Sequence, residues 1–195
     1  MDKISYALGL SMGNNFIGSG VKDLNVDDFA EALRAVYTGG EKKMSYDEAK
    51  QIITEYFSNL EKTAAEYNAK AGKEYLEENA TAEGVKVTAS GLQYQVVKEG
   101  EGAQPGPNDA VTVHYTGRLI DGTVFDSSEG REPATFGVGQ VIPGWVEGLQ
   151  LMKEGAAYRF FIPSELAYGS HGSGPIQPNS TLIFDVQLLK VKKNG

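Results

Sequence analysis

The chain has 195 residues, 41% hydrophobic and 23% charged, which is ordinary for a folded protein of one large or two small domains. Its 26 acidic and 18 basic residues give a net charge of −8, which argues against nucleic acid or an anionic membrane as the main partner. The chain has no cysteine, which excludes disulfides, thiolate zinc sites and cysteine nucleophiles.

The first ten residues, MDKISYALGL, mix charges and hydroxyl groups with apolar residues, which is not the pattern of a signal peptide. We therefore expect a cytoplasmic protein, whereas a leader ahead of Met1 would place it in the periplasm or the outer envelope. No apolar run approaches the ~18 residues of a membrane-spanning helix, so no membrane span is expected.

Residues 1–44 predict two short helices. The first has an apolar residue at every fourth position: Ile4, Leu8, Met12 and Phe16. Gly9 and Gly13 interrupt it, and each costs about 1 kcal/mol relative to alanine. We expect either that another backbone packs closely against these glycines or that the helix is bent.

The second helix has an apolar face and clear end signals. Its face is formed by Phe29, Leu33 and Val36. Asn25 or Asp27 can cap its start, and the glycine pair at 39–40 ends it.

A long third helix is predicted to follow. Ser45 and Glu48 form a capping box, and from Tyr46 to about Ala80 there is no proline and a single glycine, Gly72. At 1.5 Å per residue this helix would be about 50 Å long. Because large apolar residues become rare after Leu60, we expect its first half to be packed and its second half to be exposed to solvent.

These three helices make a poor core by themselves, because two are short and the third is too long for them to cover. A second copy of the chain would bury their apolar faces. We therefore predict a homodimer through residues 1–60, with Ile4, Leu8, Phe16, Phe29, Leu33, Ile53 and Phe57 in the contact.

After residue 85 the chain changes character, because all seven prolines and most glycines lie there. Alternating or apolar runs predict antiparallel strands at residues 92–98, 109–119, 158–163 and 181–191, and Asp121-Gly122 is a hairpin signal. The one helical segment is VIPGWVEGLQLM, residues 141–152. A short helix lying on a curved sheet must bury its large face, which places Trp145 in the concave side of the sheet.

No hydrolytic triad, phosphate-binding glycine loop or metal-ligand cluster is recognisable. His114 lies in an alternating strand and is interpreted as structural, and His171 is expected to be exposed in a glycine-rich loop. Aromatic residues are instead spread over several elements, as a core alone would require. Asp126 and Arg131 beside them indicate either the rim of a pocket or a plain surface ion pair.

Four segments resemble the FKBP-type peptidyl-prolyl isomerase domain in unbroken order over about residues 88–193. They are VTVHYTGRLIDGTVFDSS, VIPGWVEGLQLM, IPSELAYGS and PNSTLIFDVQLLKV. The first third is similar to the helical dimerisation region of the Mip-like and FkpA-like bacterial members. The resemblance implies an α+β protein: a helical dimerisation region at 1–44, a long linker helix at 45–85, and at 86–195 an antiparallel half-barrel of five or six strands wrapped on one short helix.

The resemblance also implies a binding pocket. Trp145 would be its floor and Tyr115, Phe125, Phe136 and Phe184 its walls. Asp126, Val141, Ile142, Tyr168 and Ile176 would complete it, and Arg131 would support Asp126. Tyr115, Phe125, Asp126, Trp145 and Tyr168 are expected to carry catalysis, and the others to bind substrate.

The implied function is peptidyl-prolyl cis-trans isomerisation in folding proteins, with no cofactor, no metal and no covalent step. The implied partners are proline-containing polypeptides, with tacrolimus- and rapamycin-type macrolides as inhibitors. The alternative is a non-catalytic holdase that grips unfolded chains between two arms. The enzyme is favoured, because non-catalytic family members usually lose some of these pocket residues and this chain has all of them.

Overall fold

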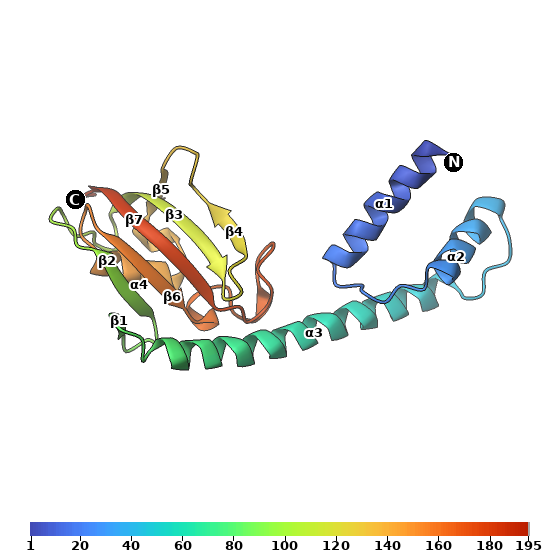
Figure 1. Ribbon diagram of the computed structural model, residues 1–195, viewed down its shortest axis with the longest axis horizontal. Coiled ribbons are helices and arrows are strands. Elements are labelled where there is room, and N and C mark those ends of the chain that lie inside the picture. The colour runs from blue at the N-terminus through green and yellow to red at the C-terminus, as the bar shows by residue number, and fades with distance from the viewer. Residues whose placement is uncertain (195) are drawn as a thin grey trace. The chain divides into compact units, whose positions relative to one another are not determined.

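The computed structural model describes residues 1–194 (Figure 1). Its contacts divide the chain into two compact units, Met1–Leu60 and Glu61–Gly195. Helix α3 (Tyr46–Asn79) contributes its first part to one unit and its second part to the other. None of the helices within residues 1–194 combines the length and the apolar character needed to cross a membrane.

The first unit consists of α1 (Lys3–Gly18), α2 (Val26–Thr38) and the start of α3, as the sequence predicted. Asn25 caps α2 by accepting hydrogen bonds from two backbone amides, and Gly39 closes it in the left-handed conformation with φ 66°. The Ser45 hydroxyl accepts from the Glu48 amide at 3.1 Å, which is one half of the predicted capping box.

The apolar side chains of this unit are poorly covered within one chain. No residue of α1 or α2 is buried, and Ile4 and Leu8 are 72% and 57% exposed. Phe16 and Phe29 meet edge to face at 5.5 Å between ring centroids, so the two short helices touch without enclosing a core. Apart from the neighbouring residues and backbone of α1 itself, no described atom lies within 4 Å of a Cβ built at Gly9 or Gly13, so no other backbone packs closely against them within one chain.

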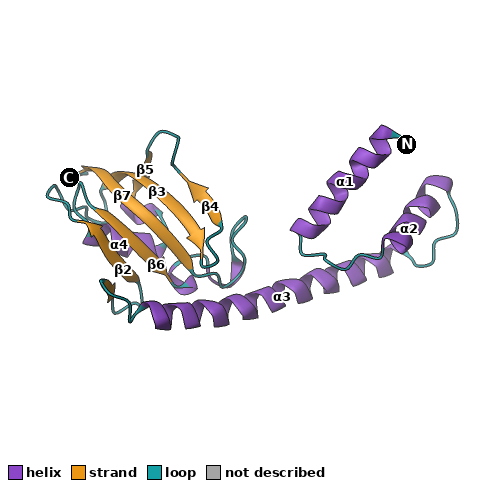
Figure 2. Ribbon diagram, viewed as in Figure 1, coloured by secondary structure: helices purple, strands orange, loops and turns teal. Residues whose placement is uncertain are grey.

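The second unit is built on one antiparallel sheet wrapped around a short helix (Figure 2). Its strands are β1 (Val85–Val87), β2 (Gln93–Lys98), β3 (Ala110–Leu119), β4 (Val124–Ser127), β5 (Ala134–Gly137), β6 (Ala157–Ile162) and β7 (Leu182–Lys192). The order is β1-β2-β6-β7-β3-β4, with β5 also paired to β3. The half-barrel therefore has seven strands rather than five or six, because the short β1 adds an edge pair to β2.

Two glycines set the close approach of helix α4 (Pro143–Leu151) to the sheet. A Cβ added at Gly144 would lie 2.5 Å from the Ile162 side chain, and one at Gly148 would lie 2.7 Å from the Phe160 ring. Both contacts are shorter than van der Waals distance, so only glycine fits at these two positions. The helix can therefore lie directly on β6, where Leu149 is fully buried.

One face of the second half of α3 packs against the sheet and its other faces are exposed, so the expectation of a solvent-exposed second half holds only for those faces. Gly72 is buried, the Tyr75 ring lies 6.2 Å from the Phe161 ring, and Gln93 Nε2 donates to the Leu76 carbonyl at 2.8 Å. These contacts use a glycine, a carbonyl and polar side chains. This half of the helix therefore contacts the sheet although it has few large apolar residues.

The segment that leads into β3 is tied to the end of β7 by the carboxylate of Asp109. Its oxygens accept hydrogen bonds from Lys193 Nζ at 2.8 Å, from the Gly106 amide at 2.6 Å and from the Asn194 amide at 3.0 Å. The Lys193 hydrogen bond is the main reason that the pKa of Asp109 falls from 3.8 to about 2, and the Gly106 amide adds to it.

This carboxylate predicts an acid-sensitive contribution to stability. A lowered folded-state pKa stabilises the fold above the unfolded value of 3.8, and this contribution is lost as pH falls toward about 2. We expect Asp109→Asn to lower the denaturant midpoint at pH 7 and to make the midpoint less dependent on pH between 4 and 2. Glu101→Gln, at an exposed position, is the control. An unchanged slope with pH in Asp109→Asn would contradict the assignment.

Candidate active site

Five aromatic side chains from separate elements meet on the inner side of the sheet. The Trp145 ring of α4 lies 5.4 Å from Tyr115 of β3, 5.7 Å from Phe136 of β5 and 5.2 Å from Phe184 of β7. The interplanar angles are 87°, 87° and 83°, the edge-to-face arrangement that aromatic quadrupoles favour. Phe125 of β4 joins through Phe184 at 5.5 Å. These five residues are called the aromatic cluster below.

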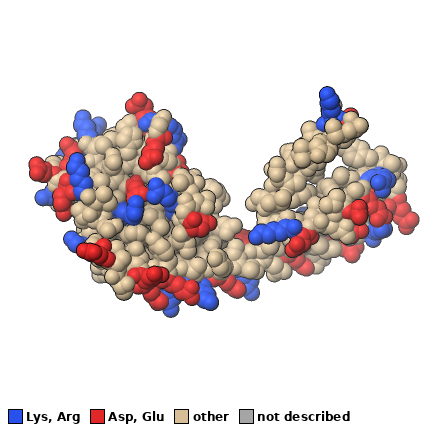
Figure 3. Space-filling model, in the orientation of Figure 1, with Lys and Arg blue, Asp and Glu red and all other residues tan. Residues whose placement is uncertain are grey.

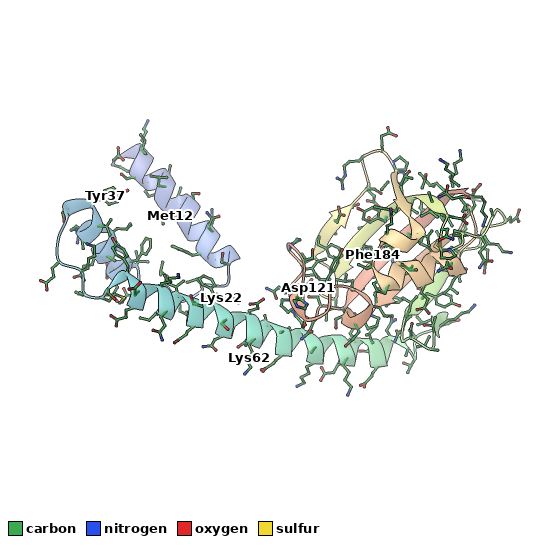
Figure 4. The ribbon with its side chains drawn as sticks, turned by 180° about the vertical axis from the view of Figure 1, so that it is seen from behind. Met12, Lys22, Tyr37, Lys62, Asp121 and Phe184 are labelled. Atoms are coloured by element: carbon green, nitrogen blue, oxygen red, sulfur yellow. The ribbon has the colours of Figure 1, made fainter. Side chains whose placement is uncertain are left out.

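Burial is graded across the aromatic cluster. Trp145 and Phe184 are 4% and 5% exposed, whereas Tyr115, Phe125 and Phe136 are half-buried. Phe184 lies among the inner side chains of its unit (Figure 4). The cluster therefore has a buried floor and partly accessible walls, an arrangement that differs from a closed core.

Gly117 makes this arrangement of rings possible and was missed by reasoning from the sequence. A Cβ at this position of β3 would lie 2.6 Å from the Phe125 ring and 2.7 Å from the Phe184 ring. No side chain larger than hydrogen could stand there without displacing both aromatics. A glycine inside an alternating strand is the one signal in the sequence that indicates such a close approach.

The polar side of the site is formed by Tyr115, Asp126 and Arg131. The Tyr115 hydroxyl donates to Asp126 Oδ2 at 2.5 Å. Arg131 Nη2 lies 3.2 Å from Asp126 Oδ1 and also donates to the Ser127 carbonyl. Asp126 and Arg131 are 49% and 65% exposed, so this ion pair orients the carboxylate more than it stabilises the fold.

The Tyr115 hydroxyl stays protonated far into the alkaline range. Burial raises its pKa to about 12, and the hydrogen bond to the Asp126 carboxylate adds to the shift. At neutral pH the hydroxyl is therefore a fixed donor that holds Asp126 at the edge of the aromatic cluster.

The remaining predicted residues lie on two further segments. Val141 and Ile142 precede α4 and are half-buried against the core. Ile142 is the N-cap of α4, and the amide of an N-cap residue has no acceptor within its helix. Ile176 is 6% exposed and packs into the core, while Tyr168 is 38% exposed.

Two further polar groups lie near the site: the His114 ring, which is hydrogen-bonded, and the Trp145 ring nitrogen, which is not bonded within the described part of the chain. His114 Nδ1 lies 3.0 Å from the Ser128 hydroxyl, which also accepts from the Tyr115 amide at 2.8 Å, so His114 helps to fix β3. Trp145 Nε1 is buried and has no hydrogen-bond partner among residues 1–194. Within that range, no group of three or more metal-ligating side chains converges on one point.

Comparison with known proteins confirms the resemblance to the FKBP-type isomerases in both units of the chain. A family model described as "FKBP-type peptidyl-prolyl cis-trans isomerase" matches residues 101–189, and one described as "Domain amino terminal to FKBP-type peptidyl-prolyl isomerase" matches residues 1–96.

Individual relatives match nearly the whole chain. The probable FKBP-type isomerase FkpA of Neisseria meningitidis serogroup B is 48% identical over 98% of this chain and 74% of its own length. The outer membrane protein MIP of Legionella longbeachae is 45% identical over 98% of this chain and 86% of its own. The crystal structure of FkpA from Escherichia coli is 40% identical with a TM-score of 0.74, covering 97% of this chain and 95% of that one. The chain belongs to the FKBP-type peptidyl-prolyl cis-trans isomerases.

Proposed function

We propose that this isomerase turns the X–Pro bond on the aromatic cluster. The observation that carries the proposal is the set of rings around the buried Trp145, with Asp126 held at its edge by two donors. Rotation about a peptide bond faces about 18–20 kcal/mol, because twisting destroys its resonance. No nucleophile is needed, since the site has only to bind the twisted amide better than either planar form.

Each part of the site has a role in binding that twisted amide. Trp145 lies under the proline ring, and Phe125, Phe136 and Phe184 enclose it. Val141 and Ile176 extend the apolar wall. A rate enhancement of 10⁴- to 10⁶-fold corresponds to about 5–8 kcal/mol, which a shaped apolar site with a few hydrogen bonds can supply.

The polar groups act on the backbone of the substrate. Asp126, oriented by Tyr115 and Arg131, faces the carbonyl of the twisting amide. The Ile142 amide and the Tyr168 hydroxyl donate hydrogen bonds to carbonyl groups of the flanking chain. These donors hold the substrate chain while the prolyl bond turns.

The substrates in this proposal are unfolded or partly folded chains that contain proline, and macrolides of the tacrolimus and rapamycin type compete for the same aromatic cluster. A protease-free isomerisation assay on a short proline peptide, with and without a macrolide, tests both statements. We expect catalysis by the full chain and its loss at saturating macrolide. Catalysis that persists at saturation would place the reaction elsewhere on the molecule.

Loss of one substrate hydrogen bond should have a modest effect. We expect Tyr168→Phe to lower kcat/KM on the peptide about two- to tenfold, since one hydrogen bond contributes about 0.5–1.5 kcal/mol net. Tyr67→Phe, which removes a hydroxyl from a 72% exposed tyrosine of α3, is the control and should be unchanged. Equal kcat/KM for Tyr168→Phe and the unsubstituted chain would remove Tyr168 from the site.

The homodimer is also part of this proposal, and the character of α1 supports it. Its apolar residues point in several directions around the axis, yet none is buried within the chain. A helix that is apolar all round is normally enclosed by other elements. In Figure 3 most of α1 is drawn in the colour of uncharged residues, with charge gathered near its start.

The side of α1 with the two glycines is a shallow hollow suited to a second helix. It has a volume of about 560 Å³ and is lined by Met1, Asp2, Ser5, Tyr6, Gly9, Leu10, Gly13, Asn14 and Ile17. The glycines let a partner backbone approach, and the residues around them supply apolar contact. We propose that residues 1–60 of a second copy fill this hollow.

The holdase alternative is not favoured, because the family to which the chain belongs is a family of enzymes and all five residues of the aromatic cluster are present.

Cytoplasmic location stays a prediction from the sequence. Fractionation of cells that express the natural gene tests it, and recovery with periplasmic or envelope markers would contradict it.

A further inference from the structure

We propose that the second half of α3 is part of the active-site scaffold. It holds residues 168–181, the segment that carries Tyr168 and Ile176, in the conformation that receives the substrate. This inference rests on the roles proposed above for those two residues. It assigns positioning functions to Asn68, Gly72 and Asn179, none of which touches the aromatic cluster.

Two asparagines tie the helix to the segment in opposite directions. Asn68 Nδ2 of α3 donates to the Pro178 carbonyl at 3.0 Å. Asn179 Nδ2 of the segment donates to the Ala65 carbonyl of α3 at 3.3 Å. Each side chain thus bonds the backbone of the other element, which fixes their relative position more firmly than a contact between two flexible side chains would.

Gly72 brings the helix and the end of the segment into close contact. A Cβ at this position would lie 2.3 Å from Thr181 Oγ1, and Thr181 is only 5% exposed. Glycine weakens a helix relative to alanine, so helix formation does not explain why residue 72 is a glycine. The close approach to Thr181 explains it, because a larger side chain would not fit.

The tied end of the segment is connected directly to the residues at the site. The Asn179 amide donates to the Gly169 carbonyl at 2.8 Å, and Gly169 follows Tyr168. Asn179 holds φ 57°, the one non-glycine residue within 1–194 with positive φ. Ile176 pairs with Ser173 through two backbone hydrogen bonds of 2.8 and 2.9 Å. A shift of Asn179 would therefore move the backbone that positions Tyr168.

A purely stabilising role for the helix is the competing explanation, and the chain offers a matched control. Asn79 lies on the same helix and donates to the Gln93 side chain of β2 at 2.8 Å. That bond joins α3 to the sheet without touching residues 168–181. Loss of Asn79 should affect stability alone, whereas loss of Asn68 should also affect substrate binding.

The test uses full-length variants and the short proline peptide. We expect Asn68→Ala and Gly72→Ala to lower kcat/KM about three- to tenfold, and Asn79→Ala to stay within about twofold, with unchanged circular dichroism in all three. Thr181→Ala added to Gly72→Ala removes the atom in conflict and should restore activity. Each loss should be less than additive with Tyr168→Phe, because both act on the same hydrogen bond to substrate.

Normal activity of Asn68→Ala and Gly72→Ala would overturn the inference, as would losses that are fully additive with Tyr168→Phe or matched by Asn79→Ala. If Gly72→Ala does not fold, Asn68→Ala and its combination with Tyr168→Phe decide the question alone. Failure of the proposed site gives a different result, since Tyr168→Phe itself would then leave kcat/KM unchanged.

Discussion

Replacement of Phe125 by alanine is expected to lower kcat/KM on a short proline peptide by about 10- to 100-fold, which corresponds to about 1.4–2.7 kcal/mol of lost transition-state binding. Phe125 supplies one wall of the aromatic cluster and meets Phe184 edge to face at 5.5 Å. Without that ring, water reaches the proline site and the twisted amide loses an apolar contact.

The fold should survive this change. A fully buried phenylalanine costs about 3–5 kcal/mol when truncated to alanine. Phe125 is only half-buried and lies on β4, an edge strand of the sheet, so its cost should fall below that range. Thermal unfolding followed by circular dichroism should still give one cooperative transition for the isomerase unit.

Val124→Ala is the matched control, because Val124 precedes Phe125 on the same strand, points to the opposite face and is 53% exposed. It should retain normal kcat/KM. Full turnover by a folded Phe125→Ala protein would show that the aromatic cluster is not the catalytic site.

Leu8→Glu is expected to convert the proposed dimer into a monomer and to separate the two kinds of activity. Leu8 lies on α1 and is 57% exposed in the single chain, so a glutamate there is tolerated by the monomer. Buried in a dimer contact, the same unpaired charge would cost several kcal/mol. Sedimentation velocity of the variant beside the unsubstituted chain measures this directly.

Activity on the short peptide should remain near normal in Leu8→Glu, because one aromatic cluster suffices for one proline. Refolding of a protein limited by prolyl isomerisation should slow at least about tenfold, because two linked sites raise the effective concentration of one long chain. Lys98→Glu, a charge change at an exposed position of β2 outside residues 1–60, is the control and should remain a dimer with both activities.

Two results would contradict this model while leaving the isomerase assignment intact. One is a monomeric unsubstituted chain. The other is a monomeric Leu8→Glu protein that refolds the protein substrate as fast as the dimer does. Point substitutions are preferred to removal of residues 1–82, because that truncation would also delete Asn68 and Gly72, which contact residues 178–181.

The sequence by itself determined the family, the helices and most of the strands, but not the short strands β1 and β5. Apolar spacing predicted α1 to α3, side-chain oxygens at Ser45 and at either Asn25 or Asp27 predicted two helix starts, and Asp121-Gly122 predicted the β3–β4 turn. These signals are local, because helix and strand periods and caps are set by residues within a few positions of each other. The residues of the aromatic cluster were also named from the resemblance to the family, four of them within the four quoted segments and Phe136 between two of these segments.

Only the tertiary structure shows which small and polar residues pack around the aromatic cluster and against residues 168–181. The clearance at Gly117, the approach of Gly72 to Thr181 and the exchange between Asn68 and Asn179 each join segments that meet only in the fold. The sequence does not show whether a glycine faces solvent or an aromatic ring, and it does not show which distant carbonyl an asparagine side chain will bond. Such contacts depend on the distance between two backbones, which local periodicity does not encode.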